Sequence, residues 1–323
     1  MINMSILAYI ESQEGKIKKN AFEIVSYACE LSKKVKSDFF VLTINVDDNS
    51  KLSKYGAQKI INISSDKLDT FNSKVYSNVI SQVAKSIKAQ YVIVSSSADS
   101  KYMSPLLSVD LNAGYLSNVV ELPISLDPFI VKRTCFTNKA FCESEISSDV
   151  KLIGLSSNSF GVVENPSDIS MEQVDVEILD NKIKVKSSEK VSGKISIADA
   201  DIVISGGRGL KGPENWNLVE DLADTLGAAT SCSKPVSDMG WRPHSEHVGQ
   251  TGKPVATNLY IAIGISGAIQ HLAGINSSKI KVVINNDPDA PFFKAADYGV
   301  VGDAFDVVPR LNEKLKAFKA QNS

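Results

Sequence analysis

Two blocks of alternating strand and helix patterns, joined by a polar stretch, limit this chain to a small set of folds. In the first block, short apolar runs typical of strands occur at residues 6–10, 39–46, 60–63 and 91–94. Helical patterns separate several of these runs, and parallel strands need such crossover helices. The first block therefore predicts an α/β domain built on a parallel sheet.

The first helix of this block has a clear start in the sequence. Asn20 stands where a capping residue is expected, and Glu23 completes the pattern of a capping box. One apolar stripe follows, formed by Ile24, Ala28, Leu31 and Val35. A second helix is predicted over residues 71–87, before the strand at 91–94.

The pattern changes between residues 119 and 185, where short alternating runs typical of strands replace the helices. These runs lie at residues 129–133, 150–155, 174–179 and 182–186. They predict a strand-rich flank on the first domain. The polar segment 187–197, which contains Gly193, predicts the domain boundary, so the first domain is expected over residues 1–190.

The strand and helix rhythm then restarts and predicts a second, doubly wound domain over residues 198–323. Strands are expected at residues 200–205, 259–265, 280–284 and 299–301. Helices are expected at 215–226, where Gly227 ends the helix, at 267–272, and over a last segment carrying Val308, Leu311, Leu315 and Phe318. A parallel sheet with helices on both faces fits this order.

Charge, cysteine content and hydropathy exclude several classes of protein. Lys plus Arg is 35 and Asp plus Glu is 37, so no basic excess exists to neutralise a nucleic acid. The four cysteines form no C-x-x-C pair, which favours a reducing compartment. The first residues match neither a signal nor a transit peptide, and the longest apolar run, residues 259–265, is too short for a membrane helix. The sequence predicts a cytoplasmic protein without membrane insertion.

A first candidate ligand site is the glycine-rich turn at residues 204–213. Gly207, Gly209 and Gly212 satisfy G-x-G-x-x-G after a strand, but Pro213 interrupts the approach to the helix and Asp224 lies within it. An ordinary nicotinamide site is therefore disfavoured. The turn is still expected to leave backbone N–H groups open to a ligand, with Arg208 as a phosphate donor. The alternative is a plain turn with a solvated arginine.

A second candidate combines Gly249-Gln-Thr-Gly-Lys253 with the run at residues 263–274. Ser266 stands where a strand is expected to become a helix, a position suited to binding an anion. His271 follows about one turn later and is either a ligand contact or a surface histidine.

A metal site at His244, Glu246 and His247 with Cys232 is disfavoured, because the spacing matches no familiar zinc motif. No nucleophile elbow occurs. The residues therefore point to a nucleotide or dinucleotide held by the second domain.

The motifs of the second domain resemble the alpha subunit of electron transfer flavoprotein. The resemblance rests on Ser205-Gly-Gly-Arg-Gly-Leu, Val248-Gly-Gln-Thr-Gly-Lys, Tyr260-Ile-Ala-Ile-Gly-Ile-Ser-Gly-Ala-Ile-Gln-His-Leu-Ala-Gly, Ile284-Asn-Asn-Asp-Pro-Asp-Ala-Pro and Ala296-Asp-Tyr-Gly. It covers residues 198–318 closely. It implies that the first domain is a subunit-interaction domain and that the second, over residues 198–323, binds FAD.

The resemblance also implies roles for individual residues around the FAD. Arg208, Ser233 and Ser266 would lie along the diphosphate and ribityl chain. Gln250 and Thr251 would stand beside the isoalloxazine, and His271 would face its C2 carbonyl. Asn285 and Asp303 would hold the adenosine end. The cofactor-binding set is completed by Lys234, Gly264, Gly267 and Gln270.

The resemblance implies a carrier of single electrons that turns over no substrate of its own. It would form a heterodimer with a beta subunit that binds AMP, accept electrons from flavin dehydrogenases such as acyl-CoA dehydrogenases, and deliver them to a membrane quinone reductase. Lys234 departs from the family, which commonly has arginine there. The alternatives are an electron-bifurcating flavoprotein subunit, an NAD(P)-linked oxidoreductase and a non-redox nucleotide-sensing module.

Overall fold

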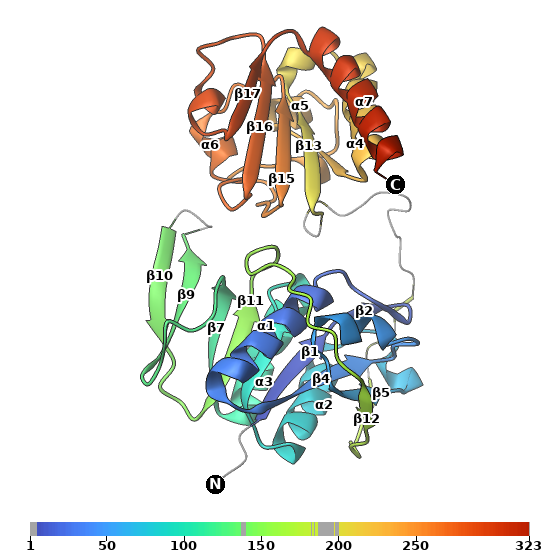
Figure 1. Cartoon of the computed structure of the whole chain (residues 1–323), viewed down its shortest axis with the longest axis vertical. Coiled ribbons are helices and arrows are strands. Elements are labelled where there is room, and N and C mark those ends of the chain that lie inside the picture. Colours follow the sequence, from blue (N-terminus) through green and yellow to red (C-terminus); the bar gives the residue numbers. More distant parts are fainter. Residues whose placement is uncertain are drawn as a thin grey trace. The chain divides into compact units, whose positions relative to one another are not determined.

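The computed structural model describes residues 5–136, 140–181, 183, 185–186, 197 and 200–322. The chain divides into two compact units, the first formed by most of the residues up to 189 and the second by most of those from 190 onward (Figure 1). The segment 187–196, in which the domain boundary is predicted, lies outside the described residues.

The first unit is built on a ten-stranded sheet with the order β10-β9-β7-β11-β6-β1-β4-β5-β12, in which β8 also pairs with β9. The strands from β7 to β12 in this order run parallel, whereas β9 is antiparallel to β7 and β8. The strands of this sheet are β1 (Ser5–Ile10), β4 (Asp38–Ile44), β5 (Lys59–Ile63), β6 (Ala89–Ser95), β7 (Ala113–Val119), β8 (Ser125–Leu126), β9 (Phe129–Cys135), β10 (Ala140–Glu145), β11 (Val150–Leu155) and β12 (Ser170–Glu172). Two further strands, β2 (Ser12–Gln13) and β3 (Lys16–Ile17), form a separate antiparallel pair. The helices are α1 (Ala21–Val35), α2 (Ser73–Ser86) and α3 (Ala98–Leu111), with 3₁₀ turns at Ser50–Tyr55 and Asp66–Leu68.

Both faces of this sheet are covered, and β1 shows how one strand serves two cores. Ile6, Ala8 and Ile10 pack in the core that contains α1, while Leu7 and Tyr9 pack in the core that contains α2 and α3. Successive side chains of a strand point to opposite faces, so an apolar residue is needed at every position of a doubly covered strand. This requirement explains the unbroken apolar runs from which the sheet was predicted.

The predicted capping box at the start of α1 is wrong. Asn20 occupies the capping position but has a helical backbone and forms no capping hydrogen bond with its side chain. Glu23 instead accepts hydrogen bonds from the backbone N–H groups of Asn158, Phe160 and Gly161, at 2.7–2.8 Å. A capping pattern describes only local bonds, whereas this carboxylate is used by a loop more than 130 residues away in the sequence.

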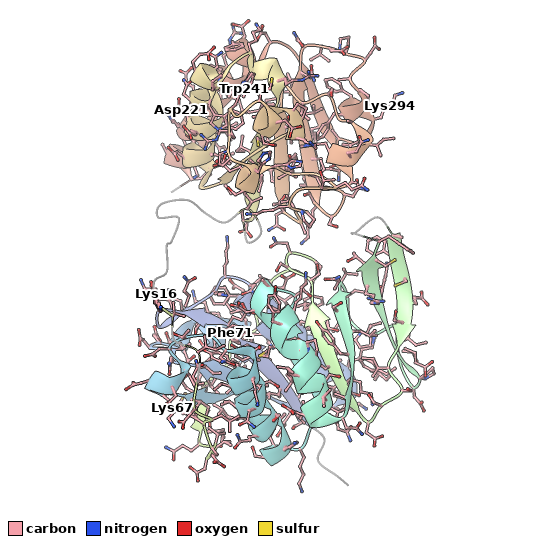
Figure 2. The ribbon with its side chains drawn as sticks, turned by 180° about the vertical axis from the view of Figure 1, so that it is seen from behind. Lys16, Lys67, Phe71, Asp221, Trp241 and Lys294 are labelled. Carbon is pink, nitrogen blue, oxygen red and sulfur yellow. The ribbon has the colours of Figure 1, made fainter. Side chains whose placement is uncertain are left out.

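The strand predicted at residues 174–179 is also wrong, although its apolar alternation is real. Val174, Val176 and Ile178 pack against the core that contains α2. The backbone of Glu177 pairs with the side chain of Gln82 on α2 instead of a neighbouring strand, through two bonds of 2.8 and 2.9 Å. Lys67, labelled in Figure 2, holds the end of this segment through an ion pair of 2.7 Å with Asp180. Of the strand predicted at residues 182–186, two residues lie outside the described residues and the others form no strand.

The second unit is a five-stranded parallel sheet with the order β14-β13-β15-β16-β17, which confirms the predicted doubly wound α/β domain. Its strands are β13 (Ile202–Gly206), β14 (Ala229–Cys232), β15 (Leu259–Ile263), β16 (Ile280–Asn285) and β17 (Tyr298–Val301). Its helices are α4 (Asn217–Leu226), α5 (Lys234–Asp238), α6 (Ile269–Leu272) and α7 (Ala304–Gln321), with 3₁₀ turns at Arg208–Leu210, Pro213–Asn215, His244–Glu246 and Pro291–Lys294.

The core of the second unit also has two faces. Ile261 and Ile263 of β15 pack with residues of α4 and α7 on one face, and Tyr260 and Ala262 pack on the other. Gly227 ends α4 in the left-handed conformation that the sequence predicts. Within the described part of the chain, no helix is long and apolar enough to cross a membrane.

Candidate functional site

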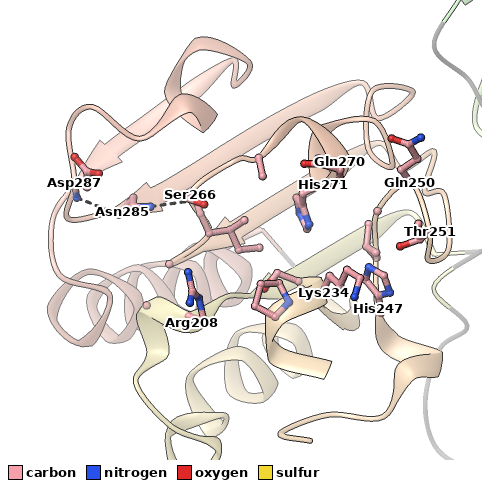
Figure 3. Close-up of a pocket in the computed structure, with 18 residues that line it drawn as sticks. Arg208, Lys234, His247, Gln250, Thr251, Ser266, Gln270, His271, Asn285 and Asp287 are labelled. Atoms are coloured by element: carbon pink, nitrogen blue, oxygen red, sulfur yellow. Dashed lines mark hydrogen bonds between the residues drawn. The ribbon is translucent and has the colours of Figure 1, made fainter. Parts of the chain in front are cut away.

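A cavity of about 550 Å³ opens at the carboxyl ends of the parallel strands of the second unit (Figure 3). Its walls come from the segments that follow β13, β14 and β15 and from the end of β16. The chain crosses from β13 to β14 on one side and later places β15 on the other side of β13. Open α/β sheets bind their ligands at such a switch point, and the volume is that of a small-molecule site.

Most of the residues predicted for the cofactor site line this cavity. The lining includes Arg208, Ser233, Lys234, Gln250, Thr251, Gly264, Ser266, Gln270, His271 and Asn285. Gly267 and Asp303 do not belong to it. Gly267 has a φ of +86° and lies against the backbone of Phe292. Asp303 caps α7 through the N–H of Phe305, with its carboxylate 3.7 Å from Lys211 Nζ.

The glycine-rich turn after β13 does not leave its glycine amides open to a ligand, contrary to the prediction. The N–H groups of Gly207 and Gly209 donate to the carbonyls of Ile263 and Gly264, at 2.8 and 3.0 Å. A Cβ atom on Gly209 would lie 2.6 Å from the Cα of Gly264, and one on Gly207 would strike the Gly264 carbonyl. These glycines therefore let the turns after β13 and β15 pack backbone against backbone. The spacing of these glycines is therefore explained by the contact between the two backbones and not by phosphate binding.

Gly264 is itself held in a conformation that favours glycine. Its φ is +63°, and an added Cβ would lie 2.8 Å from the Cα of Gly209. This position turns the chain sharply out of β15 and into the wall of the cavity.

Ser266 lies on the cavity wall, but not at a helix N-terminus as predicted. The helix α6 begins at Ile269, and Ala268 occupies its capping position without a side-chain cap. The carbonyl of Ser266 accepts the N–H of Phe292 at 3.0 Å, which fixes the backbone there, and its side chain is exposed. The hydroxyl is thus presented by an anchored loop.

Asn285, at the end of β16, ties two walls of the cavity together. Its buried amide donates to the carbonyl of Ile265 at 3.0 Å and accepts the N–H of Asp287, also at 3.0 Å. The first bond positions the turn after β15, and the second orients the loop that carries Asp287. Asp287 also lines the cavity, a position that was not predicted from the sequence.

His271 is held on the inner side of α6 by a buried tyrosine. Its Nε2 lies 3.0 Å from the hydroxyl of Tyr260. Its Nδ1 is buried without a hydrogen-bond partner, although the backbone of Val248 lies near the ring. Burial, and secondarily His247, lowers the pKa of His271 to about 4, so the ring is neutral at pH 7. A buried polar nitrogen without a partner is uncommon in a folded protein, and this one lies on the wall of the cavity.

His247 also lines the cavity, although its sequence context pointed only to a disfavoured metal site. It is buried, and it lies beside the end of β14, where it forms a parallel bridge with Cys232. Burial first, and then the charge of Lys234, lowers the pKa of His247. Its neighbour Glu246 is occupied by two hydrogen bonds from Arg242, of 2.7 and 2.8 Å. In the part of the chain that the structure describes, no cluster of three metal-ligating side chains occurs.

The cationic side chains of the cavity are both exposed. Arg208 stands on the turn after β13, and Lys234 begins α5 after β14. Lys234 Nζ pairs with Asp238 at 2.7 Å, and this hydrogen bond lowers the pKa of the Asp238 carboxyl. The lining thus combines two cations, several hydroxyls and amides, and two neutral histidines. Such a set suits an anionic ligand that also carries polar groups.

Figure 3 shows how these groups are distributed along the cavity. Asn285 and Asp287 lie at one end, Gln250 and Thr251 at the other, and Arg208, Ser266, Lys234 and His271 between them. The order of groups fits an elongated ligand whose anionic part lies near the middle.

Family models and known proteins give a consistent comparison. The model described as "Electron transfer flavoprotein domain" matches residues 6–183, and "Electron transfer flavoprotein FAD-binding domain" matches residues 196–276. The chain is 34% identical over 315 residues to the electron transfer flavoprotein subunit alpha of Bacillus subtilis, covering 95% of each chain. It is 33% identical to that of Thermoanaerobacterium thermosaccharolyticum, covering 97% of this chain and 98% of the relative. It is 36% identical to that of Mycobacterium tuberculosis, covering 97% and 99%.

Proposed function

The chain belongs to the electron transfer flavoprotein alpha-subunit family, and we propose that the cavity of its second unit binds one FAD. The family makes the chain part of an electron carrier. A bound FAD supplies the redox chemistry, and the protein supplies the binding, orientation and electrostatics that set its potential.

The observation that carries this proposal is the unpartnered Nδ1 of His271 on the cavity wall. The Tyr260 hydroxyl lies 3.0 Å from Nε2, and we assign it as the donor, which places the proton of the neutral ring on Nδ1. Nδ1–H is then a donor in need of an acceptor, and the C2 carbonyl of a flavin is such an acceptor. Because negative charge accumulates at this edge when a flavin is reduced, the donor favours the reduced cofactor.

The middle of the cavity is where we place the diphosphate and ribityl chain. Arg208 provides a fixed fork of donors there, and the hydroxyls of Ser233 and Ser266 provide neutral donors. Gly264 and Gln270 form the adjoining wall. Gln250 and Thr251, at one end, would flank the isoalloxazine, with Lys234 adding positive charge near the ring.

We place the adenosine end of the FAD beside Asn285 and Asp287, which line the opposite end of the cavity. Asp303, the carboxylate expected from the family resemblance, caps α7 and faces Lys211. Asp287 is therefore the better candidate for binding the ribose hydroxyls. We expect Asp287→Asn to weaken FAD binding more than Asp303→Asn, measured by flavin titration of the two variants.

The family also supports a beta subunit as partner. We propose that this partner carries AMP and that the heterodimer passes single electrons from flavin dehydrogenases, such as acyl-CoA dehydrogenases, to a membrane quinone reductase in a bacterial cytoplasm. The chain would act as a carrier without substrate turnover of its own. Electron bifurcation with additional FAD is the alternative within the family.

The proposal is tested on the chain co-expressed and purified with its beta subunit. We expect a flavin absorption spectrum and one FAD per heterodimer. Arg208→Ala and Ser266→Ala should each weaken FAD binding by about 10- to 100-fold, the loss of one charge-assisted hydrogen bond. Arg310→Ala, which removes an exposed arginine from α7, is the matched control and should leave FAD affinity unchanged.

Three results would contradict this function. A colourless heterodimer that binds nicotinamide nucleotides would favour the NAD(P)-linked alternative, and one that binds only ATP or AMP would favour a nucleotide sensor. Equal FAD affinity in the wild type, Arg208→Ala and Ser266→Ala would show that the diphosphate lies elsewhere.

A further inference from the structure

His247 is the second histidine of the cavity, and the proposed function gives it no role. Its side chain is buried, and Figure 3 shows it near both Lys234 and Thr251. Thr251 and Gln250 mark the end of the cavity where the proposed function places the isoalloxazine. His247 therefore lies at the end of the site where electrons would enter and leave.

The loop that follows His247 encloses its ring without forming a hydrogen bond to it. A Cβ atom on Gly252 would lie 2.8 Å from Nδ1, and one on Gly249 would lie 3.2 Å from Nε2. Both ring nitrogens thus pack beside positions where a side chain would crowd the imidazole. Among the residues that the structure describes, neither nitrogen has a hydrogen-bond partner. The ring can therefore gain a proton without breaking a bond inside the protein.

His271, the other histidine of the cavity, is less able to gain a proton. The Tyr260 hydroxyl, assigned above as the donor, already uses the lone pair of its Nε2 at 3.0 Å. Protonation of His271 would break this buried hydrogen bond, and burial has lowered its pKa to about 4. His247 has no such bond to lose. Of the two rings, His247 is the one that can change its charge near neutral pH.

The surroundings of His247 keep its ring neutral as long as the cavity holds no added negative charge. Burial lowers the pKa of His247 most, and the charge of Lys234 lowers it further. Asp238 acts in the opposite direction, but its carboxylate is paired with Lys234 Nζ at 2.7 Å. The influence of His244, on the preceding 3₁₀ turn, again lowers the pKa.

The other titratable groups on the elements around this ring provide no unpaired negative charge. They are Cys232 on β14, Glu246 and Arg242 in their ion pair, the exposed Lys253, and the neutral His271. Burial raises the pKa of the Cys232 thiol to about 12, so this thiol is also neutral. A proton on His247 therefore requires a further negative charge, which a ligand in the cavity would have to supply.

We propose that His247 binds a proton when the cofactor in the cavity is reduced and releases it when the cofactor is reoxidised. The proposal rests on the FAD site proposed above. An added electron brings negative charge into the cavity, and negative charge in a poorly solvated site raises the proton affinity of a nearby imidazole. The flavin dehydrogenase supplies the electron, and water supplies the proton. When the acceptor takes the electron, the imidazole loses its extra N–H bond and the proton returns to water.

This linkage makes the reduction potential depend on pH. Reduction and protonation favour each other by the same free energy, because the coupling between two sites is reciprocal. In the pH range where His247 is protonated only in the reduced protein, each pH unit changes the equilibrium constant of a one-electron step tenfold, which is about 59 mV. The potential should therefore rise as the pH falls through this range and level off on either side.

The first test is a spectroscopic redox titration of the heterodimer between about pH 5.5 and pH 8.5, on either side of the usual histidine pKa. His247→Gln keeps a polar side chain that does not titrate, and His244→Gln is the matched control, since His244 is exposed on the neighbouring 3₁₀ turn. The wild type and His244→Gln should share one pH dependence of the first one-electron potential, and His247→Gln should show a flatter one. Protons taken up by the flavin itself are common to the three proteins and cancel from the comparison.

A second measurement follows the imidazole directly in the wild-type heterodimer and does not depend on FAD retention in His247→Gln. The chain has three histidines, so nuclear magnetic resonance of its isotope-labelled imidazoles gives three titration curves, assigned with His244→Gln and His271→Gln. In the oxidised protein, His247 should titrate at a lower pH than His244. After full reduction its pKa should rise by at least about one unit, which is tenfold tighter proton binding.

Equal pH dependence in the wild type and His247→Gln would overturn the proposal, and so would a His247 titration that reduction leaves in place. If the wild-type heterodimer holds no FAD, the proposed function fails and this proposal fails with it. FAD retention together with an unshifted His247 would reject the role of His247 alone.

Discussion

The Tyr260 hydroxyl lies 3.0 Å from Nε2 of His271, inside the core of the second unit. Tyr260 is fully buried on β15, and its burial raises the pKa of its hydroxyl well above the usual value, so it stays protonated. The tyrosine therefore fixes the orientation of the imidazole from the side opposite the cavity. His271 is presented to a ligand by a rigid strand and not by the short helix alone.

Removing this support should lower the reduction potential of the cofactor without abolishing the fold. In Tyr260→Phe the imidazole of His271 loses a hydrogen bond of about 1 kcal/mol, so its Nδ1 is held less firmly toward the flavin. We expect one-electron potentials lower by up to about 40 mV, the equivalent of that energy. Spectroscopic redox titration of the heterodimer measures the shift, and His271→Ala should lower the potentials at least as far. Unchanged potentials in both variants would make the pair purely structural.

The buried neutral histidine should make the protein less stable in mild acid. The pKa of His271 is about 4 in the folded protein, and an unfolded chain has a histidine pKa of about 6.5. The unfolded state therefore binds the proton first, and the stability present above pH 6.5 is lost as the pH falls toward 4. The full effect is about 3 kcal/mol.

Urea unfolding of the wild type and of His271→Gln between pH 7 and pH 4.5 checks this prediction. The wild type should lose more unfolding free energy over this range than the variant, whose amide does not titrate. His247, whose pKa is also lowered, remains in both proteins and so cancels from the difference. Parallel curves would show that His271 is not buried as a neutral ring.

Gly264→Ala should cost more than a glycine substitution at an equally strained but open position. Gly227 has a φ of +66° with nothing within 4 Å of an added Cβ, whereas Gly264 has a φ of +63° and faces the Gly209 backbone. We expect Gly227→Ala to cost about 1 to 2 kcal/mol, and Gly264→Ala at least about 3 kcal/mol with loss of FAD retention. The only tryptophans, Trp216 and Trp241, lie in the second unit, so their fluorescence reports its unfolding. Similar costs at the two positions would argue against the backbone contact.

Glu23→Ala should destabilise the first unit strongly, because it leaves three backbone N–H groups without their acceptor. Each bond to a carboxylate contributes about 1.5 to 3 kcal/mol, so a loss of at least about 3 kcal/mol is expected. Asn20→Ala, which removes no capping bond, should change stability by less than about 0.5 kcal/mol. Far-ultraviolet circular dichroism during denaturation follows both variants. If Asn20→Ala instead lowers the free energy of unfolding by about 1 kcal/mol, Asn20 caps the helix as the sequence predicted.

The parallel cores could be predicted from the sequence because burial on both faces leaves continuous apolar runs. The helix α3 escaped prediction for the opposite reason. Tyr102, Leu106 and Val109 are apolar and exposed on it, and Pro105 interrupts its pattern, so the sequence shows no single apolar stripe. The apolar alternation at residues 174–179 predicted a strand because alternation reports burial of one face and not the identity of the hydrogen-bond partner.

The lining of the cavity was predictable where a motif follows a strand, as at Arg208 and Ser266, whereas Ser233 was expected only from the family resemblance. It was not predictable where a residue enters through a long-range contact. His247 reaches the cavity by bridging to Cys232, and no spacing in the sequence reveals that pairing. The amides of Gly207 and Gly209 were expected to face a ligand, but their acceptors lie more than fifty residues later in the chain.

The contact of Gly207 and Gly209 with Gly264 also has a consequence for how this family can vary. When a large side chain intrudes on a neighbour, a second substitution that shrinks the neighbour can relieve the clash. Here both partners are already glycine, and the atoms in contact belong to the main chain. A substitution at one of these glycines therefore cannot be compensated by a smaller residue at the other. Larger residues can enter either turn only if the two backbones move apart.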